Sequence, residues 1–126
     1  MDNKLFLQIT SIVRAERLKQ EKKWGKQDHP PELWTTIEVE EVGEAAQAGL
    51  RHNYTEKYGP RDKQMENLGN LIEEWVQVAA VAFAVIENMA TDYPNAPAVF
   101  KDLHERTSAF LERIQEADSD HSEGTP

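Results

Sequence analysis

Residues 66–89 read ENLGNLIEEWVQVAAVAFAVIENM, and this stretch determines what kind of fold the chain can form. Its central run, WVQVAAVAFAVI at residues 75–86, is apolar on every side of a helix apart from Gln77. A helix that is apolar all round is typically a buried one. The run has about a dozen residues, whereas a bilayer span requires roughly 20. We therefore expect the central, buried helix of a helical protein rather than a membrane-spanning segment.

Three further helices are predicted on either side of this stretch. In residues 3–20, apolar side chains recur at spacings of three and four with charged residues between them, which is typical of an amphipathic helix. A second helix should begin between Pro31 and Thr36 and run to about Arg51. The same amphipathic spacing marks a fourth helix over residues 99–114.

The connecting segments are predicted from Gly, Pro and clusters of polar residues. Residues 22–34, 51–64 and 91–97 contain these breakers and are expected to be loops or turns. Thr35 followed by Glu38 matches a capping box, a typical helix start. No segment alternates apolar and polar residues as a half-buried strand does. The predicted fold is therefore all-α, a four-helix bundle.

The charge balance of the chain limits its partners. The 126 residues include 14 Lys and Arg against 23 Asp and Glu, for a formal net charge of −9. Because nucleic-acid and anionic-membrane surfaces require clustered positive charge, we expect neither a nucleic acid polymer nor a membrane as partner. The chain has no Cys, which excludes disulfides and thiolate metal sites. Together with an N-terminal segment that lacks a secretory pattern, this predicts a cytoplasmic protein.

The acidic residues are unevenly distributed along the chain. Residues 116–126 hold four of them and no Lys or Arg, so this tail is predicted to be disordered. Residues 1–115 are expected to form a single domain, since roughly 100 to 200 residues per domain is usual. Six acids of that domain gather in two short clusters: Glu38, Glu40, Glu41 and Glu44, and then Glu73 and Glu74.

Both acidic clusters lie on predicted helices, and helical geometry assigns each a face. At about 100° per residue, Glu40, Glu41 and Glu44 fall within one sector of about 100°. On the third helix Glu74 and Gln77 lie on one side, about 60° apart, at the edge of the apolar run. An acidic face is ordinary for a surface helix, but a nearly all-apolar helix has no solvated face for such residues.

If the two acidic faces meet, their carboxylates require a counter-ion. Like charges at close range cannot all stay ionised without one. A divalent cation resolves the repulsion, and a set of oxygen ligands without His or Cys favours Mg²⁺ or Mn²⁺. The sequence contains no Glu-x-x-His pair, no phosphate-binding loop and no serine-hydrolase motif that would indicate another chemistry. The residues thus predict a hard-cation site between the second and third helices.

In the order of its motifs the chain resembles the all-α nucleoside triphosphate pyrophosphohydrolases, and among them the small MazG-like proteins of bacteria and phages. The resemblance covers about residues 14–89. It is carried by KWGKQDHP at 23–30, by EVEEVGEAAQA at 38–48 with its EExxE, and by IEEWVQVAAVAFAVIE at 72–87 in the place of the family's second ExxD motif.

The resemblance implies an activity and roles for individual residues. Members of this family hydrolyse nucleoside triphosphates to the monophosphate and pyrophosphate, with Mg²⁺ held by the two motifs. By this resemblance Glu41, Glu44 and Glu74 correspond to metal ligands, and Glu40 corresponds to the residue that assists metal binding or orients and deprotonates the attacking water. The resemblance also implies assembly as a homodimer or homotetramer.

The chain departs from the family pattern at one metal-binding position. Gln77 stands where the family has an Asp, so a neutral amide that offers one oxygen replaces a negative charge. The first reading keeps Gln77 as a metal ligand of a working enzyme. The alternative is a non-catalytic helical module of the same ancestry that binds a nucleotide or a protein.

The KWGKQDHP segment supplies candidate substrate contacts. Trp24 or Trp34 could stack on a base, and Lys23 or Lys26 could meet phosphate, because aromatic stacking contributes about 1 to 3 kcal/mol per base. The alternative is that the tryptophan pins the loop to the bundle and the lysines are solvated. The residue types alone leave both readings open.

Overall fold

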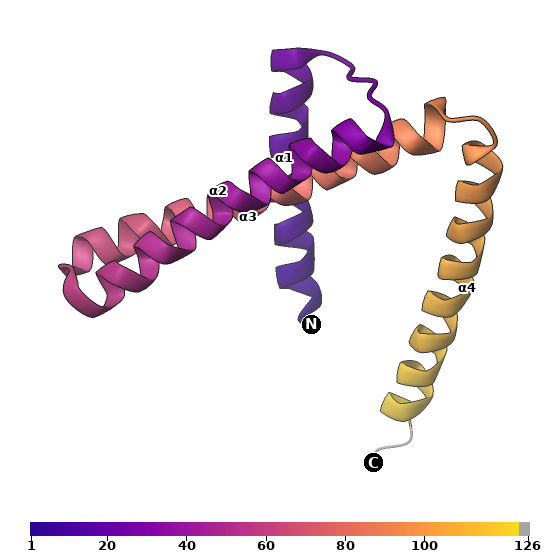
Figure 1. The fold of residues 1–126 in the computed structure, drawn as a ribbon. Coiled ribbons are helices and arrows are strands. Elements are labelled where there is room, and N and C mark those ends of the chain that lie inside the picture. The colour runs from indigo at the N-terminus through magenta and orange to yellow at the C-terminus, as the bar shows by residue number, and fades with distance from the viewer. Residues whose placement is uncertain (124–126) are drawn as a thin grey trace. The chain divides into compact units, whose positions relative to one another are not determined.

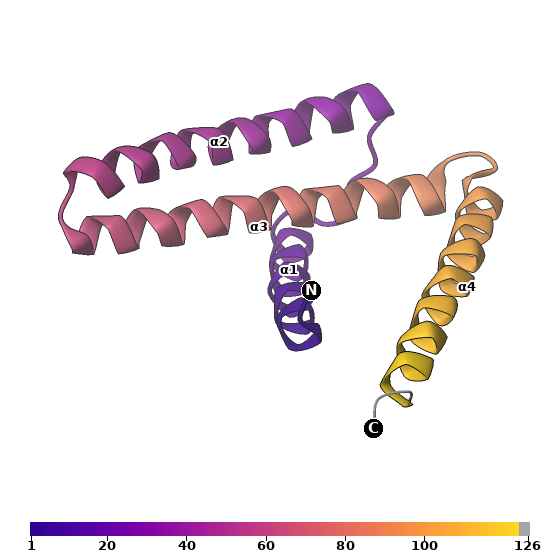
Figure 2. The ribbon, with the colours of Figure 1, turned by 90° about the horizontal axis from the view of Figure 1, so that it is seen from below.

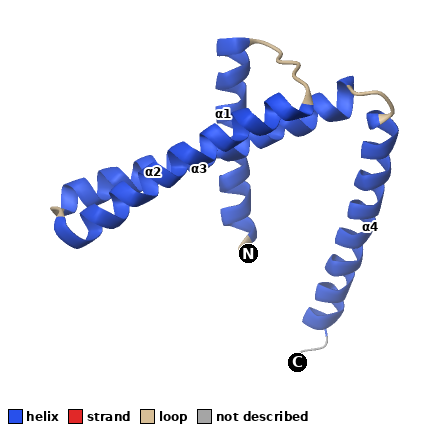
Figure 3. Cartoon of the chain, viewed as in Figure 1, coloured by secondary structure: helices blue, strands red, loops and turns tan. Residues whose placement is uncertain are grey.

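The computed structural model describes residues 1–123 as four α-helices joined by short loops (Figure 1, Figure 3). They are α1 Asn3–Trp24, α2 Pro31–Tyr58, α3 Arg61–Asp92 and α4 Ala96–Glu123. No strand occurs among the described residues, so the prediction of an all-α protein with four helices is confirmed. The chain divides into two compact units, Met1–Asn88 and Met89–Pro126, which are described separately.

The first unit is built on an antiparallel pair of helices. α2 and α3 lie side by side along their length, and α1 crosses this pair (Figure 1, Figure 2). The helices approach closely because the buried positions are mostly small, with one large residue among them. The buried apolar side chains are Val13, Trp34, Ala45, Ala48, Ala80, Val81 and Ala84. This packing brings the acidic residues Glu41 and Glu44 of α2 next to Glu74 of α3.

The connection between α2 and α3 is much shorter than the sequence predicts. The expected loop over residues 51–64 is wrong, because α2 continues to Tyr58 and α3 begins at Arg61. Only Gly59 and Pro60 separate them, and the Gly59 N–H donates to the Thr55 carbonyl oxygen at 2.8 Å. Polar residues extend a helix as long as no breaker intervenes, so the two-residue Gly-Pro break is sufficient to reverse the chain.

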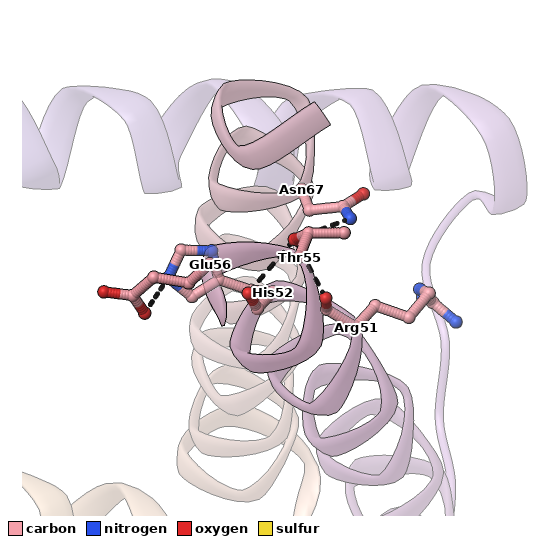
Figure 4. A network of polar contacts seen from close by, with 5 residues as sticks. All are labelled: Arg51, His52, Thr55, Glu56 and Asn67. Atoms are coloured by element: carbon pink, nitrogen blue, oxygen red, sulfur yellow. Dashed lines mark hydrogen bonds and ion pairs between the residues drawn. The ribbon is translucent and has the colours of Figure 1, made fainter. Parts of the chain in front are cut away.

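Polar contacts hold the far end of this hairpin together (Figure 4). The Thr55 hydroxyl donates to the backbone carbonyl of Arg51 at 3.0 Å, and Asn67 of α3 donates its amide N–H to the same hydroxyl at 3.2 Å. His52 lies 3.6 Å from the Glu56 carboxylate one turn further along α2. The Arg51 side chain extends away from this network, which leaves its guanidinium for other contacts (Figure 4).

The segment between α1 and α2 is also shorter than predicted. Instead of a loop over residues 22–34, α1 continues to Trp24, and α2 begins at Pro31 within the predicted range. Gly25 ends α1 with φ 71°, a conformation that favours glycine. The predicted capping box is wrong, because the Thr35 hydroxyl lies inside α2 and donates to the Pro31 carbonyl oxygen at 2.9 Å. Pro30 takes the cap position without a side-chain hydrogen bond.

One buried side chain fastens this loop to α3. Asn88 is 3% exposed, and its carbonyl oxygen accepts from the Trp34 indole N–H at 2.7 Å and from the His29 backbone N–H at 3.2 Å. Its amide group donates to the Asp28 carboxylate at 3.1 Å. The His29 ring also meets the Trp34 ring edge-on, with centroids 4.8 Å apart. Asn88 therefore links the loop, α2 and α3 through a single amide.

α3 is less buried than its sequence predicts. Ala80, Val81 and Ala84 pack against the rest of the unit, whereas Trp75 and Phe83 are more than half exposed. The expectation of burial around the whole helix is therefore wrong for the single chain, because only one side of α3 is covered. By length and composition alone this helix could cross a membrane, a test that core helices of soluble proteins also pass.

The second unit consists mainly of α4. This helix begins at Ala96 after a turn in which Asn95 adopts φ 64°, and it continues to Glu123. The predicted domain end at residue 115 lies within the helix, so acidic residues of the expected tail extend it. Residues 124–126 of that tail lie outside the described residues.

Candidate metal centre and adjoining cavity

Three carboxylates from two helices converge in the first unit. Glu41 and Glu44 project from α2 one turn apart, and Glu74 projects from α3. Each contributes a carboxylate oxygen, and these oxygens all lie within 4.8 Å of one another. The antiparallel hairpin produces this meeting, since it brings the acidic sector of α2 against the start of the apolar run of α3. We call these three residues the carboxylate triad.

The triad is electrostatically unfavourable when it holds no cation. Partial burial raises the pKa of Glu41, and repulsion from Glu44 and then Glu74 raises it further. Burial likewise raises the pKa of Glu74, as do the charge of Glu44 and a hydrogen bond with Glu44, while the Arg51 guanidinium opposes the change. Like charges held this close favour protonation or a bound cation.

Two buried oxygen atoms of the triad lack a hydrogen-bond partner among the described residues. Oε2 of Glu41 and Oε2 of Glu74 are both buried, and neither forms a hydrogen bond within the described residues. Buried polar atoms in native proteins are nearly always satisfied by protein, water or an ion. A ligand set made only of carboxylate oxygens suits a hard divalent cation such as Mg²⁺ or Mn²⁺. The residues present therefore fit such an ion chemically.

The other predicted residues of this site lie around the triad. Glu40 is exposed on α2 and stands outside the triad, although its charge contributes to the raised pKa of Glu41. Gln77 lines a cavity together with Glu41. Glu38 was not singled out as a ligand, yet burial raises its pKa and its Oε1 is buried without a hydrogen bond within the described residues. Its position one turn before Glu41 is the signal that could have identified it.

The raised pKa values of the triad predict how stability depends on pH. Glu41 and Glu74 bind protons more tightly in the folded than in the unfolded chain, so their contribution to stability is present below about pH 4.5 and is lost as the pH rises through the raised pKa values. Without divalent cations, the Glu41→Gln variant should therefore melt about 2–5 °C above the wild type at pH 8, and this gap should narrow toward pH 5.

Thermal melts in the presence of a chelator measure this effect. The exposed neighbour variant Glu73→Gln is the control: the charge of Glu73 contributes least to the raised pKa of Glu74, so its melting temperature should depart from that of the wild type much less than that of Glu41→Gln at each pH. Mn²⁺ added at pH 8 should raise the melting temperature of the wild type and leave that of Glu41→Gln much less changed. Equal pH profiles for wild type and Glu41→Gln would show that the triad carries no electrostatic strain.

A cavity of about 420 Å³ opens beside the triad, between α1, α2 and α3. Its volume lies in the range of small-molecule sites, roughly 300–1,000 Å³. Glu41 belongs both to the triad and to the cavity lining, so the cavity adjoins the triad directly. The walls contributed by α2 and α3 are largely apolar: Trp34, Ile37, Glu41, Gln77, Val81 and Ala84.

Some of the residues predicted to contact the substrate line the cavity, and others do not. Trp24 and Lys23 line it, with the Lys23 ammonium 4.7 Å from the centroid of the Trp24 ring, and Trp24 is 56% exposed. Trp34 forms part of the wall but is only 2% exposed, and its indole N–H is bonded to Asn88. Lys26 lies in the loop and does not line the cavity.

The α1 side of the cavity combines the predicted Lys23 and Trp24 with four residues that were not identified as site residues from the sequence: Glu16, Lys19, Gln20 and Gln27. Their spacing of three and four along one helix face is a signal that the printed sequence contains. This face and the loop residue after it comprise Glu16, Lys19, Gln20, Lys23, Trp24 and Gln27. Polar residues at this spacing also form the solvated face of any amphipathic helix, so the pattern by itself does not mark a site.

Comparisons with known proteins assign no relative to this chain. No family model, no curated protein and no solved structure matches it.

Proposed function

We propose that this protein is a Mg²⁺- or Mn²⁺-dependent nucleotide pyrophosphohydrolase that converts a nucleoside triphosphate to the monophosphate and pyrophosphate. The observation that carries the proposal is the triad, in which carboxylate oxygens within 4.8 Å of one another adjoin a cavity lined by Trp24 and Lys23. The resemblance of the motifs to MazG-like proteins supports the same assignment. The proposal includes a cytoplasmic role in nucleotide-pool clearance or alarmone control, without a nucleic acid polymer or membrane as partner.

The proposed roles follow from the positions of the residues. Glu41, Glu44 and Glu74 would hold the cation, with the Gln77 amide oxygen as a further ligand from the cavity side. A bound divalent cation neutralises the triphosphate and lowers the pKa of a coordinated water. Glu40, exposed next to the triad, would orient the attacking water and accept its proton. The water oxygen bonds to the α-phosphorus, and the bond from that phosphorus to the bridging oxygen breaks, so that pyrophosphate leaves.

Direct measurement of pyrophosphate tests this activity. The purified protein should release pyrophosphate from at least one member of a panel of NTPs and dNTPs with Mg²⁺ or Mn²⁺, and chelation should stop the release. Inorganic phosphate should not be the first product, since the cleavage lies between the α and β phosphates. A folded protein that releases no pyrophosphate from any of them would refute the enzymatic proposal.

Gln77 supports a second candidate function, a non-catalytic module that binds a nucleotide or a protein. The Gln77→Asp substitution distinguishes the two, because it restores a negative charge at the edge of the cavity. If Gln77 is a working ligand, Gln77→Asp should lower turnover about 10-fold or more by changing the charge balance of the metal site. A gain of pyrophosphate release from an inactive wild type would instead identify a module that has lost catalysis.

We also propose that the chain assembles as a homodimer or homotetramer. Large apolar side chains are exposed on all four helices of the single chain, more than a monomer usually presents. The most prominent on α1, α3 and α4 are Phe6, Ile9, Ile12, Trp75, Phe83, Ile86, Phe100 and Phe110. Sedimentation equilibrium should give two or four times the chain mass of 14.4 kDa, and a 14.4 kDa species at micromolar concentration would contradict this expectation.

A further inference from the structure

The cavity beside the triad contains one polar group whose environment is unusual. Gln20 lies on α1, lines the cavity and is only 9% exposed. Within the part of the chain that the structure describes, no residue forms a hydrogen bond with its side-chain amide. The Gln20 amide atoms are not among the fully buried side-chain atoms that lack a partner, so they are open to the cavity that Gln20 lines. Unpaired polar groups in such a position usually meet water or a ligand.

Another buried polar side chain, that of Asn88, shows how an amide that stabilises the fold is bonded in this protein. Asn88 is 3% exposed, and its amide is bonded to Trp34, His29 and Asp28. Gln20 is also mostly buried as a residue, at 9% exposed, but it forms none of these bonds. The contrast indicates that the Gln20 amide is available for a molecule that enters the cavity, rather than for holding the fold together.

The chemistry of an amide defines the kind of group that it recognises. Its carbonyl oxygen accepts and its NH₂ donates, side by side in one plane. The complement is a planar group with an adjacent donor and acceptor, which the hydrogen-bonding edge of a nucleobase presents. The cavity also offers the apolar surfaces that the faces of a base require, Ile37 and Val81 among them.

The remaining residues of the cavity continue this pattern toward the triad. Lys19 and Lys23 stand one turn apart on the same helix face and supply positive charge for phosphate groups. Glu41 connects the cavity to the triad. A nucleotide whose base meets Gln20 would thus have cations available for its phosphates and the carboxylates available for a metal.

We propose that Gln20 reads the base of the nucleotide and that this protein therefore selects substrates by nucleobase, not by the phosphate chain alone. This inference rests on the proposed function, since it specifies the substrate class of the same site. It assigns base recognition to α1, a helix that contributes nothing to the triad. Substrates without a base, such as tripolyphosphate, are expected to be poor.

The test is a comparison of substrates with and without a base. Gln20→Met keeps the length of the side chain but removes both hydrogen-bonding groups. For the preferred dNTP, this variant should lower kcat/KM about 10- to 100-fold, mainly by raising KM. For 2-deoxyribose 5-triphosphate, which lacks the base, wild type and variant should be equal. Gln8→Met, on the exposed part of α1, is the matched control and should leave both substrates unchanged.

A binding measurement separates failure of this inference from failure of the proposed function. Calorimetry with the matching nucleoside monophosphate requires no turnover, and Gln20→Met should weaken its binding to the same extent. If Gln20→Met weakens binding of the monophosphate but no nucleotide yields pyrophosphate, then recognition of the base by Gln20 is supported and the proposed enzymatic activity is refuted. If the wild type releases pyrophosphate and Gln20→Met lowers kcat/KM equally for the base-containing and base-free substrates, then recognition of the base by Gln20 is refuted and the enzymatic activity is supported.

A second variant keeps the test decisive if Gln20→Met does not fold. Gln20→Glu keeps the size and one acceptor oxygen but replaces the donating NH₂ group by a second, negatively charged oxygen. It should also lose the preference for the base-containing substrate, while melting curves report whether it is folded. Unchanged discrimination between the two substrates in either folded variant would overturn the inference.

Discussion

Glu41→Gln is expected to lower the rate of pyrophosphate release by about 10²- to 10³-fold, the largest loss of activity that we predict. The substitution replaces a carboxylate oxygen of the triad by an amide and leaves the side-chain volume nearly unchanged. Glu41 is also the residue that joins the triad to the cavity, so its loss affects both the cation and the position of the nucleotide. The initial rate at saturating Mg²⁺, followed by a pyrophosphate-coupled assay, measures the change.

A control variant shows whether the loss of a negative charge on these helices is enough by itself to lower the activity. Glu73→Gln removes the same charge from the adjacent position of α3, outside the triad, and should keep the rate within about two-fold of wild type. Mn²⁺ binding followed by electron paramagnetic resonance should weaken in Glu41→Gln and not in Glu73→Gln. If Glu41→Gln retained both full activity and Mn²⁺ affinity, the triad could not be the metal centre.

Asn88→Ala should destabilise the protein by about 2–4 kcal/mol, the largest effect on folding that we predict. The Asn88 carbonyl oxygen is the acceptor for the buried indole N–H of Trp34 at 2.7 Å, and the loop loses its bonds to α3 at the same time. The loss leaves a donor unsatisfied in a site where water has little access. Chemical denaturation measured by circular dichroism gives the free energy of unfolding.

Two companion variants isolate the role of this amide. Asn53→Ala changes an exposed asparagine on α2 and should alter the free energy of unfolding by no more than about 0.5 kcal/mol. Trp34→Phe removes the indole donor, so the double variant with Asn88→Ala should lose less than the sum of the two single losses. Strict additivity would mean that the Asn88 to Trp34 bond makes no separate contribution.

The helical fold could be predicted because its signal is local. Apolar residues at spacings of three and four define each helix in a short window, and no segment competes as a strand. The helix boundaries were less accurate for the same reason. Polarity marked residues 51–64 as a loop, yet polar side chains on a solvated helix face produce the same pattern, and only Gly59 and Pro60 break the backbone.

Some features of the candidate site could be predicted from the sequence, and others could not. The converging carboxylates were predictable, because charged residues at the start of an apolar helix have few alternatives to meeting a partner or an ion. Gln20 was not, since a glutamine among charged residues on an amphipathic helix resembles any solvated side chain. Its burial arises where α1 crosses the α2–α3 pair, and a crossing of helices leaves no mark within one helix.

The sequence by itself determined that this protein is helical, where its acids cluster, and that they suit a hard cation, because residue spacing and ligand type are properties of short segments. The tertiary structure decided which groups meet: it brought Glu74 to Glu41 and Glu44, bonded Trp34 to Asn88, and placed the amide of Gln20 in the cavity without a hydrogen bond to any described residue. These outcomes depend on how the helices pack against one another, and packing is a property of the folded chain as a whole.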